Sequence, residues 1–482
     1  MNHLQKKSFL ILSIFLSISL NATDINILEA GAAEGGKILN TAIIQNSINR
    51  ISESGGGTLI IPPGKYLTGS LVLRSGVSIK VCKGAILIGS TNLSDYLNIQ
   101  PKYVALRTFQ ATRQLIYAED QTNISITGNG IIDGQGGAFR RTGDGDEPGI
   151  TRPHLIQFIN CKNVRIENVT MQNSGGWMQH YLACENLIIK GISVYNHCNF
   201  NNDGLDIDGC RNVVVSDCIV DSDDDAICMK STSPAPCKDV IISNCIVKSH
   251  CNALKLGTES TGGFYNILIN NCSVSPSVDP DPIYGTVNGQ SAISVEMVDG
   301  GILEQVIVTN ITVSETNCPI FIRLGNRARK HSPGAPEPGM GVLRNVFISN
   351  ITATTSSLIT SNITGIPGGY TENISLDNIL ITSIADVKKE LFQNEIPEND
   401  KGYPTPAMFG NVLPASGFFI RHVKNIKLNN IQLVVKGNDS RPAFIFQDVK
   451  DALVKYPAVY FAGGDNELIV KDTGCENVRV IQ

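Results

Sequence analysis

Apolar and polar residues alternate in short segments that recur along the chain and share one pattern. Each segment begins with Asn or Asp, continues with apolar residues at every second position, and ends at Asn, Asp or Gly followed by Ile, Val or Cys. The clearest copies are Asn163–Val169, Asn186–Ile192, Asn212–Cys218, Asp239–Cys245 and Asn266–Cys272. They are spaced by roughly 23 to 27 residues, which is the period of one coil of a solenoid.

The alternation predicts short β-strands that each have one apolar face. No segment has enough apolar surface to fold alone, whereas stacking successive coils about 4.8 Å apart buries a continuous core. We therefore predict an all-β fold, a single-domain parallel β-helix over residues 23–482, and the general crossover preference makes it right-handed. A sandwich of hairpins is the competing interpretation, but hairpins would not repeat at this period.

The ends and insertions of the solenoid have patterns of their own. Residues 1–22 place Lys6 and Lys7 before an apolar run, which is typical of a secretory signal peptide and too short for a membrane span. Residues 39–51 have apolar positions at helical spacing and predict a short helix that caps one end. Gly- and Pro-rich insertions at 134–153, 327–341 and 384–416 are expected to form a binding surface. We expect a soluble monomer, periplasmic or secreted.

The amino-acid composition limits the kinds of molecule that the protein is expected to bind. The net charge of −5 provides no global basic field for nucleic acid, so an acidic substrate must be held by a local cluster of cations. Cys218, Cys245 and Cys272 follow the same position of the repeat and are predicted to be stacked, buried thiols rather than disulfides. The chain has no tight Cys-x-x-Cys pair that would suggest zinc, and we predict no metal and no cofactor.

Residues 201–258 carry carboxylates at positions that the coil period brings together. Asp203 directly precedes one predicted strand, and Asp224 and Asp225 precede the next. His250 precedes the third strand and is expected to join the same cluster. The segments 204–207, 226–229, 253–256 and 321–324 are interpreted as one strand position on different coils. Alternation then points four side chains outward on one face: Asp206, Cys228, Lys255 and Arg323.

Such a cluster has the groups that glycoside hydrolysis requires. One carboxylic acid protonates the leaving oxygen, and another carboxylate activates water or attacks the sugar. Crowded carboxylates raise the pKa of at least one member, which allows it to hold a proton near neutral pH. The run 223–225 by itself is more often a solvated turn or a calcium site, but Asp203 one coil earlier reverses that preference.

The same motifs resemble glycoside hydrolase family 28, the polygalacturonase family. The likeness rests on Asn202-Asp203-Gly204-Leu205-Asp206, Asp224-Asp225, Ser249-His250 and Ile322-Arg323-Leu324, and it extends over most of the mature chain. It implies a right-handed β-helix that cleaves glycosidic bonds in pectin with inversion of configuration. The first and third motifs look more like exo-acting bacterial members than fungal endo-enzymes.

The resemblance also implies roles for individual residues. Asp224 would be the general acid, while Asp203 and Asp225 would hold and activate the water. His250 would orient the carboxylates, and Arg323 would bind a substrate carboxylate. Asn202 and Asp206, from the same motif as Asp203, are further candidates for substrate binding.

The chain departs from the family pattern at two places. His250 is followed by Cys251 and extra residues before the next glycine, so Asn252 is an alternative occupant of the histidine's place. Arg323-Leu324-Gly325 lacks the lysine of the family motif. Three explanations are open: a shifted alignment places Arg323 in the lysine's position, Lys255 or Arg327 supplies the missing charge, or the leaving-group sugar is not a galacturonate. Trp177, the single tryptophan, either stacks on a sugar ring or covers the edge of the solenoid.

We therefore predict an exported inverting glycoside hydrolase that acts on α-glycosidic bonds of a pectic polysaccharide or oligosaccharide. Two other classes remain open from the sequence. One is a pectate-lyase-like enzyme that uses calcium, and the other is a non-catalytic β-helix that binds carbohydrate. The sequence leaves the sugar, the linkage and endo versus exo action undetermined, because the binding loops decide them.

Overall fold

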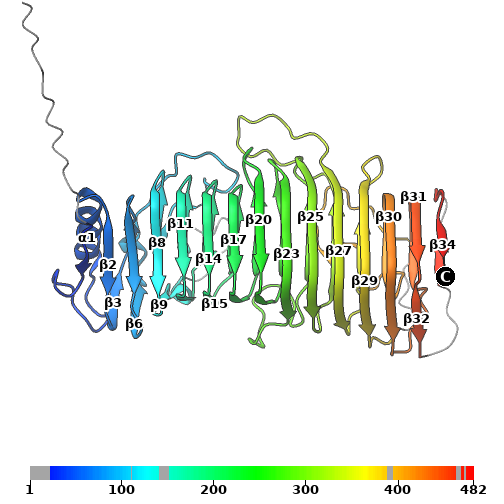
Figure 1. The fold of residues 1–482 in the computed structure, drawn as a ribbon, viewed down its shortest axis with the longest axis horizontal. Helices are drawn as coiled ribbons and strands as arrows, with labels where there is room; N and C mark the ends of the chain where they lie inside the picture. The colour runs from blue at the N-terminus through cyan, green and yellow to red at the C-terminus, as the bar shows by residue number, and fades with distance from the viewer. Residues whose placement is uncertain are drawn as a thin grey trace, which may run out of the picture.

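Parallel strands are stacked along the long axis of the molecule, and helix α1 covers the N-terminal end (Figure 1). The computed structural model describes residues 22–109, 111–139, 151–387, 395–462, 468–471 and 474–481. Every pairing between its named strands is parallel, and each coil contributes strands to three columns, which we call stacks A, B and C. The predicted right-handed parallel β-helix is confirmed. The predicted signal peptide lies almost entirely outside the described residues.

Stack A carries the candidate site. Its strands are β4 (Leu71–Val72), β7 (Gln114–Glu119), β10 (His154–Ile159), β13 (Gln179–Leu182), β16 (Leu205–Asp208), β19 (Ile227–Ser231), β22 (Asn252–Ser260), β24 (Ser291–Met297), β26 (Cys318–Leu324), β28 (Ser361–Thr364), the first parts of β30 (Phe418–Val435) and β31 (Phe444–Lys455), and β33 (Ile469–Lys471).

Stack B follows stack A on each coil. Its strands are β1 (Ile25–Asn26), β2 (Gly57–Ile61), β5 (Val77–Val81), β8 (Thr122–Gly128), β11 (Lys162–Glu167), β14 (Glu185–Lys190), β17 (Arg211–Ser216), β20 (Cys237–Ser243), the first parts of β23 (Phe264–Ser275), β25 (Ile302–Val313), β27 (Val342–Thr355) and β29 (Thr371–Ser383), later parts of β30 and β31, and β34 (Arg479–Ile481).

Stack C completes the coil. Its strands are β3 (Gly64–Thr68), β6 (Ala85–Gly89), β9 (Ile131–Asp133), β12 (Thr170–Gln172), β15 (Ser193–Asn196), β18 (Ile219–Ser222), β21 (Ile246–Ser249), the last parts of β23, β25, β27, β29 and β30, and β32 (Ala458–Phe461). Among the described residues, short 3₁₀ turns occur in connections at Leu93–Asp95, Gly136–Ala138 and Pro406–Phe409.

The common shape of the coils follows from the polar ends of the repeat unit. Asn186, Asn212 and Asp239 have φ angles of 57°, 56° and 56°, in the left-handed region that Asn and Asp adopt more readily than other side-chain-bearing residues. Their side chains also join neighbouring coils, since Asn186 Nδ2 donates to Asn163 Oδ1 at 2.9 Å and Asn212 Nδ2 donates to Asn186 Oδ1 at 3.1 Å. The Asn and Asp positions of the repeat therefore mark where the chain bends.

The apolar positions of the repeat form the core. Ile189, Val215, Ile242 and Ile269 are stacked in register in stack B, and each side chain is fully buried. Helix α1 (Thr41–Glu53) packs Ile44, Ile48 and Ile51 against the first coil, which confirms the predicted capping helix. Within the described part of the chain, no helix is long and apolar enough to cross a membrane.

The thiols of the repeat are also stacked. Cys218, Cys245 and Cys272 are buried and free, as predicted, and all thirteen cysteines of the chain are free thiols. A second set at the turn between stacks A and B escaped the sequence analysis: Cys161, Cys184, Cys210 and Cys237. Cysteine acts in both sets as a small apolar residue that fits a tight turn.

The connections that leave the coils are gathered beside stack A. The loop after β26, residues 325–341, arches over the upper ends of the strands (Figure 1). It meets the loop before β7, because Arg329 and Arg107 both contact Glu259, at 3.4 and 3.1 Å. Of the other two predicted insertions, residues 140–150 and 388–394 lie outside the described residues.

Substitution of two adjacent residues of β20 tests which face of this strand is buried in the core. We expect Ile242→Ala to lower the free energy of unfolding by about 2–4 kcal/mol, because Ile242 is fully buried. Ile241→Ala should cost less than about 1 kcal/mol, because Ile241 is 42% exposed on the outer face. Urea unfolding followed by circular dichroism measures both, and equal losses would contradict the assigned strand faces.

Candidate active site

Three carboxylates meet at the turn that leads into stack A. Asp203 precedes β16, Asp224 and Asp225 precede β19, and one oxygen from each lies within 4.8 Å of the others. Hydrogen bonds between coils fix this arrangement, since Gly204 N donates to Asp225 O and Ala226 N donates to Asn252 O, both at 2.9 Å. The sequence prediction that these aspartates come together is confirmed.

The carboxylates are buried, but to different degrees. Asp224 is 9% exposed, whereas Asp203 and Asp225 are 2% and 3% exposed. The turn between β18 and β19 orients Asp224, because its backbone carbonyl accepts hydrogen bonds from Ser222 Oγ at 2.8 Å and from Ser249 Oγ at 2.6 Å. Of the three, Asp224 is therefore the most accessible to a ligand.

Two buried lysines partly compensate the crowded negative charge. Lys255 Nζ lies 2.9 Å from Asp225 Oδ2, and Lys230 Nζ lies 3.2 Å from Asp206 Oδ1 and 3.5 Å from Asp203 Oδ2. Lys230 also lies 4.0 Å from Asp225 Oδ2, so it reaches three of the carboxylates at once. The sequence analysis did not single out Lys230, although its place two residues after Cys228 on the same outward face was a usable signal.

This environment separates the proton affinities of neighbouring aspartates. Burial, followed by the charge of Asp225, raises the pKa of Asp224 to about 7. Burial alone would also raise the pKa of Asp225, but Lys255 and Lys230 outweigh it, and the pKa lies below its ordinary value. Burial and the charge of Asp206 raise the pKa of Asp203 well above its ordinary value. Asp224 therefore keeps its proton up to about pH 7, whereas Asp225 is already ionised there.

The structure separates His250 from the three-carboxylate cluster that it was expected to join. Its Nδ1 lies 3.1 Å from Asp223 Oδ1, and its Nε2 lies 2.9 Å from the carbonyl oxygen of Asp279. Asn252 contacts the cluster instead, because its Nδ2 donates to Asp225 Oδ1 at 2.7 Å. Ser291 holds the amide in place by donating to Asn252 Oδ1 at 2.6 Å. The pairing between coils explains this change, because Ser249 pairs with Ser222 and Leu254 with Ile227. His250 therefore lies at the position of Asp223, and Asn252 lies at the position of Asp225.

The position of Arg323 in stack A differs from the one that the sequence predicted. We expected Arg323 to align with Lys255, but Lys255 pairs with Ser294 and Ser294 pairs with Phe321, so Arg323 lies two residues further along. It still points outward, where Nη1 donates to the carbonyl of Gly365 and Nη2 to that of Glu398, both at 2.7 Å. The side chain is 1% exposed and joins loops to the sheet.

Lys255 and Arg327 meet around one aromatic ring. Lys255 Nζ lies 3.4 Å from Tyr403 Oη and 3.7 Å from Glu296 Oε2. The guanidinium of Arg327 lies 5.0 Å from the centre of the Tyr403 ring, and its buried Nη1 has no hydrogen-bond partner among the described residues. Tyr403 itself is exposed, so the group opens to solvent beside the carboxylates. No pattern in the sequence pointed to Tyr403, which comes from a distant loop.

The remaining candidates are fully enclosed. Asn202 donates to the carbonyls of Ser174 and Gly176 at 2.9 Å and accepts two backbone N–H bonds, so its side chain shapes the turn. Asp206 is fully buried beside Lys230, and burial raises its pKa to about 6. Trp177 is 5% exposed beneath Lys230, whose Nζ lies 5.0 Å from the ring centre, so this ring covers the sheet rather than offering a free face.

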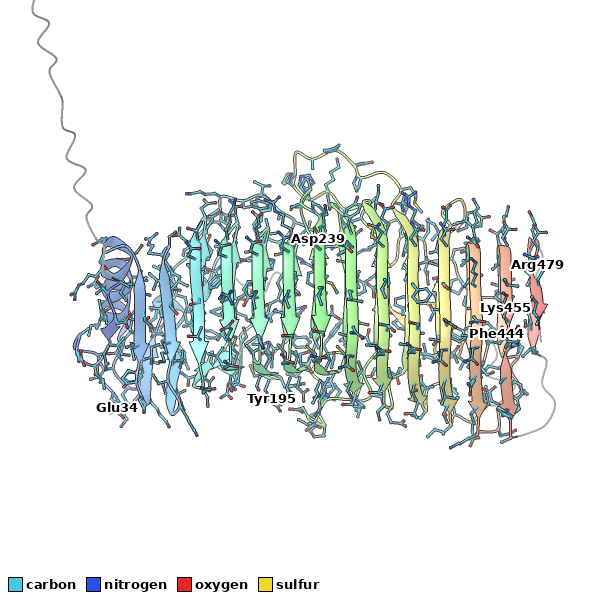
Figure 2. The ribbon with its side chains drawn as sticks, in the orientation of Figure 1. Glu34, Tyr195, Asp239, Phe444, Lys455 and Arg479 are labelled. Carbon is cyan, nitrogen blue, oxygen red and sulfur yellow. The ribbon has the colours of Figure 1, made fainter. Side chains whose placement is uncertain are left out.

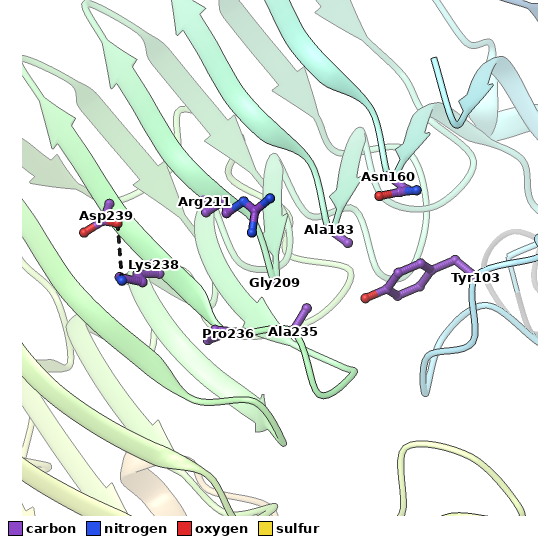
Figure 3. Close-up of a pocket in the computed structure, with 9 residues that line it drawn as sticks. All are labelled: Tyr103, Asn160, Ala183, Gly209, Arg211, Ala235, Pro236, Lys238 and Asp239. Atoms are coloured by element: carbon purple, nitrogen blue, oxygen red, sulfur yellow. Dashed lines mark ion pairs between the residues drawn. The ribbon is translucent and has the colours of Figure 1, made fainter. Parts of the chain in front are cut away.

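A separate hollow lies at the corner between stacks A and B. Its volume is about 330 Å³, and Figure 3 shows Tyr103 and Arg211 on opposite sides of it. Lys238 and Asp239 at its edge pair with each other at 3.9 Å. None of the three clustered carboxylates lines this hollow, so the chemistry of the site lies elsewhere.

Fold and site together define a β-helix protein with a buried group of carboxylates that differ in proton affinity. The sequence profile of the glycosyl hydrolases family 28 matches residues 53–399, and the chain belongs to that family. The predicted resemblance is thereby confirmed.

Individual relatives are similar over part of their length. A probable polygalacturonase of Vitis vinifera is 34% identical over 226 residues, which are 45% of this chain and 46% of that protein. An exo-poly-α-D-galacturonosidase of Dickeya chrysanthemi is 28% identical over 253 residues, which are 42% of this chain and 41% of that protein. The chain thus spans less than half the length of these two relatives.

Solved structures share the fold. An exopolygalacturonase from Thermotoga maritima has a TM-score of 0.62 at 23% identity, with 76% of this chain and 88% of that chain covered. A family 28 exopolygalacturonase from Yersinia enterocolitica has a TM-score of 0.63 at 18% identity, with 90% and 78% covered.

The raised pKa of Asp224 predicts a pH-dependent effect on stability. The folded state binds this proton more tightly than the unfolded state, so the contribution is present below about pH 4 and is lost as the pH rises through about 7. Asp224→Asn, which cannot ionise, should therefore raise Tm relative to the wild type at pH 8 and change it little at pH 4. Asp217→Asn, on an exposed turn, is the matched control. A lower Tm for Asp224→Asn at pH 8 would contradict the assignment.

Proposed function

We propose that the protein hydrolyses α-glycosidic bonds in a pectic polysaccharide or oligosaccharide. The observation that carries this proposal is the pair Asp224 and Asp225, adjacent carboxylates of which one has a raised pKa of about 7 and the other a lowered pKa. Hydrolysis of a glycoside needs one proton donor and one carboxylate that activates water. Family membership supports the same chemistry.

In the proposed reaction, Asp224 gives its proton to the glycosidic oxygen as the bond to the anomeric carbon breaks. Asp225, with Asp203 beside it, takes a proton from the water that attacks the anomeric carbon, and the leaving sugar departs with the proton from Asp224. Lys255 and Asn252 hold Asp225 ionised and oriented, since both contact its oxygens at 2.9 Å or less. His250 acts one step away as a positioning residue, through Asp223 and the turn that carries Asp224.

The cations around the site favour an acidic sugar. Lys255, Lys230 and Arg327 gather on stack A and the loop after it, although the chain as a whole has a net charge of −5. Arg327 Nη1 has no hydrogen-bond partner among the described residues, and the guanidinium lies 5.0 Å from the centre of the Tyr403 ring, so a carboxylate is the group that would complete its hydrogen bonding. Relatives named for action on polygalacturonate support a galacturonate-containing substrate, and the exo-acting ones support cleavage from a chain end.

Two further properties belong to the proposal. The order of charged and apolar residues in 1–22 supports export to the periplasm or the medium. We also propose that the protein acts as a monomer and needs no nucleic acid or membrane partner.

Substitution of the proposed acid tests the reaction. Asp224→Asn should lower kcat on oligogalacturonate by about 10²–10⁴-fold, because the amide cannot donate a proton to the leaving oxygen. Binding of the same oligosaccharide, measured by calorimetry, should change little, and Asp217→Asn should leave both properties intact. Unchanged hydrolysis by Asp224→Asn would sink the mechanism.

The same assay separates the second candidate function, a calcium-dependent lyase. This candidate is considered because the three clustered carboxylates lie close enough together to hold a cation. A lyase leaves an unsaturated sugar that absorbs in the ultraviolet and loses activity in chelator. The hydrolase should release saturated products, and its rate should not depend on chelator. Binding of the oligosaccharide with no cleavage by the wild type would favour a non-catalytic carbohydrate-binding protein.

The stereochemistry of the product is a separate prediction. We expect the anomer first released from an α-linked substrate to be β, as seen by proton NMR during the first minutes of reaction. The test is informative because carboxyl groups of inverting enzymes are usually about 6.5–9.5 Å apart, whereas one oxygen from each aspartate here lies within 4.8 Å of the others. An α-product would mean that Asp203 or Asp225 attacks the sugar directly.

A further inference from the structure

A second group of potential ligands lies at the opposite face of the turn that carries Asp224. His197, Asp223 and His250 follow β15, β18 and β21, whose last residues, Asn196, Ser222 and Ser249, are stacked in register. The three side chains therefore occupy one position on three successive coils. One ring nitrogen of each histidine and one carboxylate oxygen of Asp223 lie within 4.8 Å of one another.

The outer nitrogen of each histidine already has an acceptor. His197 Nε2 lies 2.9 Å from Asp221 Oδ1, and His250 Nε2 lies 2.9 Å from the carbonyl oxygen of Asp279. An N–H at each Nε2 satisfies these acceptors and leaves a lone pair on each Nδ1. Histidines that bind metals are held in this way, with the outer N–H donated to a carboxylate or a backbone carbonyl.

The Nδ1 atom of neither histidine faces a hydrogen-bond donor among the described residues. His197 Nδ1 is buried and has no hydrogen-bond partner among the described residues, and its side chain is only 2% exposed. His250 Nδ1 faces Asp223 Oδ1 at 3.1 Å. A lone pair on Nδ1 and a carboxylate oxygen repel each other, and either a proton on Nδ1 or a metal cation between the two atoms removes this repulsion.

We propose that His197 Nδ1, His250 Nδ1 and the carboxylate of Asp223 bind a divalent transition-metal ion of the Zn²⁺ class. Two imidazoles and one carboxylate are a ligand set that zinc accepts in tetrahedral geometry, with water as a fourth ligand. Both carboxylate oxygens are oriented by backbone N–H groups, since Ile283 N donates to Oδ1 at 2.7 Å and Tyr284 N donates to Oδ2 at 2.9 Å.

The site is closed by the loop between β23 and β24. Tyr195, at the lower edge in Figure 2, donates to Asp279 Oδ2 at 2.8 Å and fastens this loop. A metal ion here joins three coils and the loop directly behind Asp224, and its ligands are neither the proposed acid nor the proposed base. The residues of this loop that contact the cluster or its supporting residue Asp221 include Ser277, Val278, Asp279, Ile283, Tyr284 and Thr286.

Metal titration of the full-length protein tests the proposal. Chelator-stripped wild type should take up one equivalent of Zn²⁺ in competition with a chromophoric chelator, and Zn²⁺ should raise Tm. His197→Gln should weaken this binding by at least about 10-fold. His331→Gln, a histidine outside the cluster, and Asp224→Asn, in the carboxylate cluster, should both bind as the wild type does.

Spectroscopy of metal bound to the wild-type protein tests the site without any substitution. Co²⁺ at one equivalent should give the visible absorption of a tetrahedral site, and X-ray absorption of the Zn²⁺ form should show two imidazole ligands. Equal affinity in His197→Gln, loss of binding in Asp224→Asn, or no saturable uptake by the wild type would each overturn the proposal. Because none of these readouts is activity, the result is separate from the fate of the proposed hydrolase function.

Discussion

The register between neighbouring coils is the constraint on which the site depends. Backbone hydrogen bonds from Gly204 to Asp225 and from Ala226 to Asn252 align three successive turns at the entrance to stack A. Side chains at equivalent positions must then lie about one strand spacing apart, roughly 4.8 Å. Asp203, Asp225 and Asn252 are therefore neighbours because the core of the solenoid fixes where each coil begins.

That constraint forces like charges together in a buried place. Burial favours the neutral form of every carboxylate, whereas Lys230 and Lys255 favour the ionised form of those that they contact. Asp225 lies 2.9 Å from Lys255, whereas the ion pairs of the described residues include none between Asp224 and either lysine, so the two adjacent residues differ in proton affinity. The proposed acid and the proposed base differ because the lysines form ion pairs with Asp225.

One turn presents its aspartates to two faces of the molecule. Asp224 and Asp225 meet Asp203 and the cations of stack A, while Asp223 meets His250 and the loop between β23 and β24. That loop is therefore joined to the turn through hydrogen bonds to Asp223. The long connections supply the groups that the coils lack, such as Tyr403 beside Lys255 and Glu398 beside Arg323.

The sequence by itself determined the periodic part of this protein. Alternation and the Asn and Asp positions specified the strands, the bends, the buried thiols and the approach of Asp203 to Asp224 and Asp225, because each follows from one repeated local rule. Only the tertiary structure decided the contacts of His250, Asn252, Arg323 and Tyr403. The pairing between coils sets which residues share a position, and it places His250 opposite Asp223 and Arg323 two residues beyond the position of Lys255. Tyr403 reaches Lys255 from a distant loop whose path no local pattern specifies.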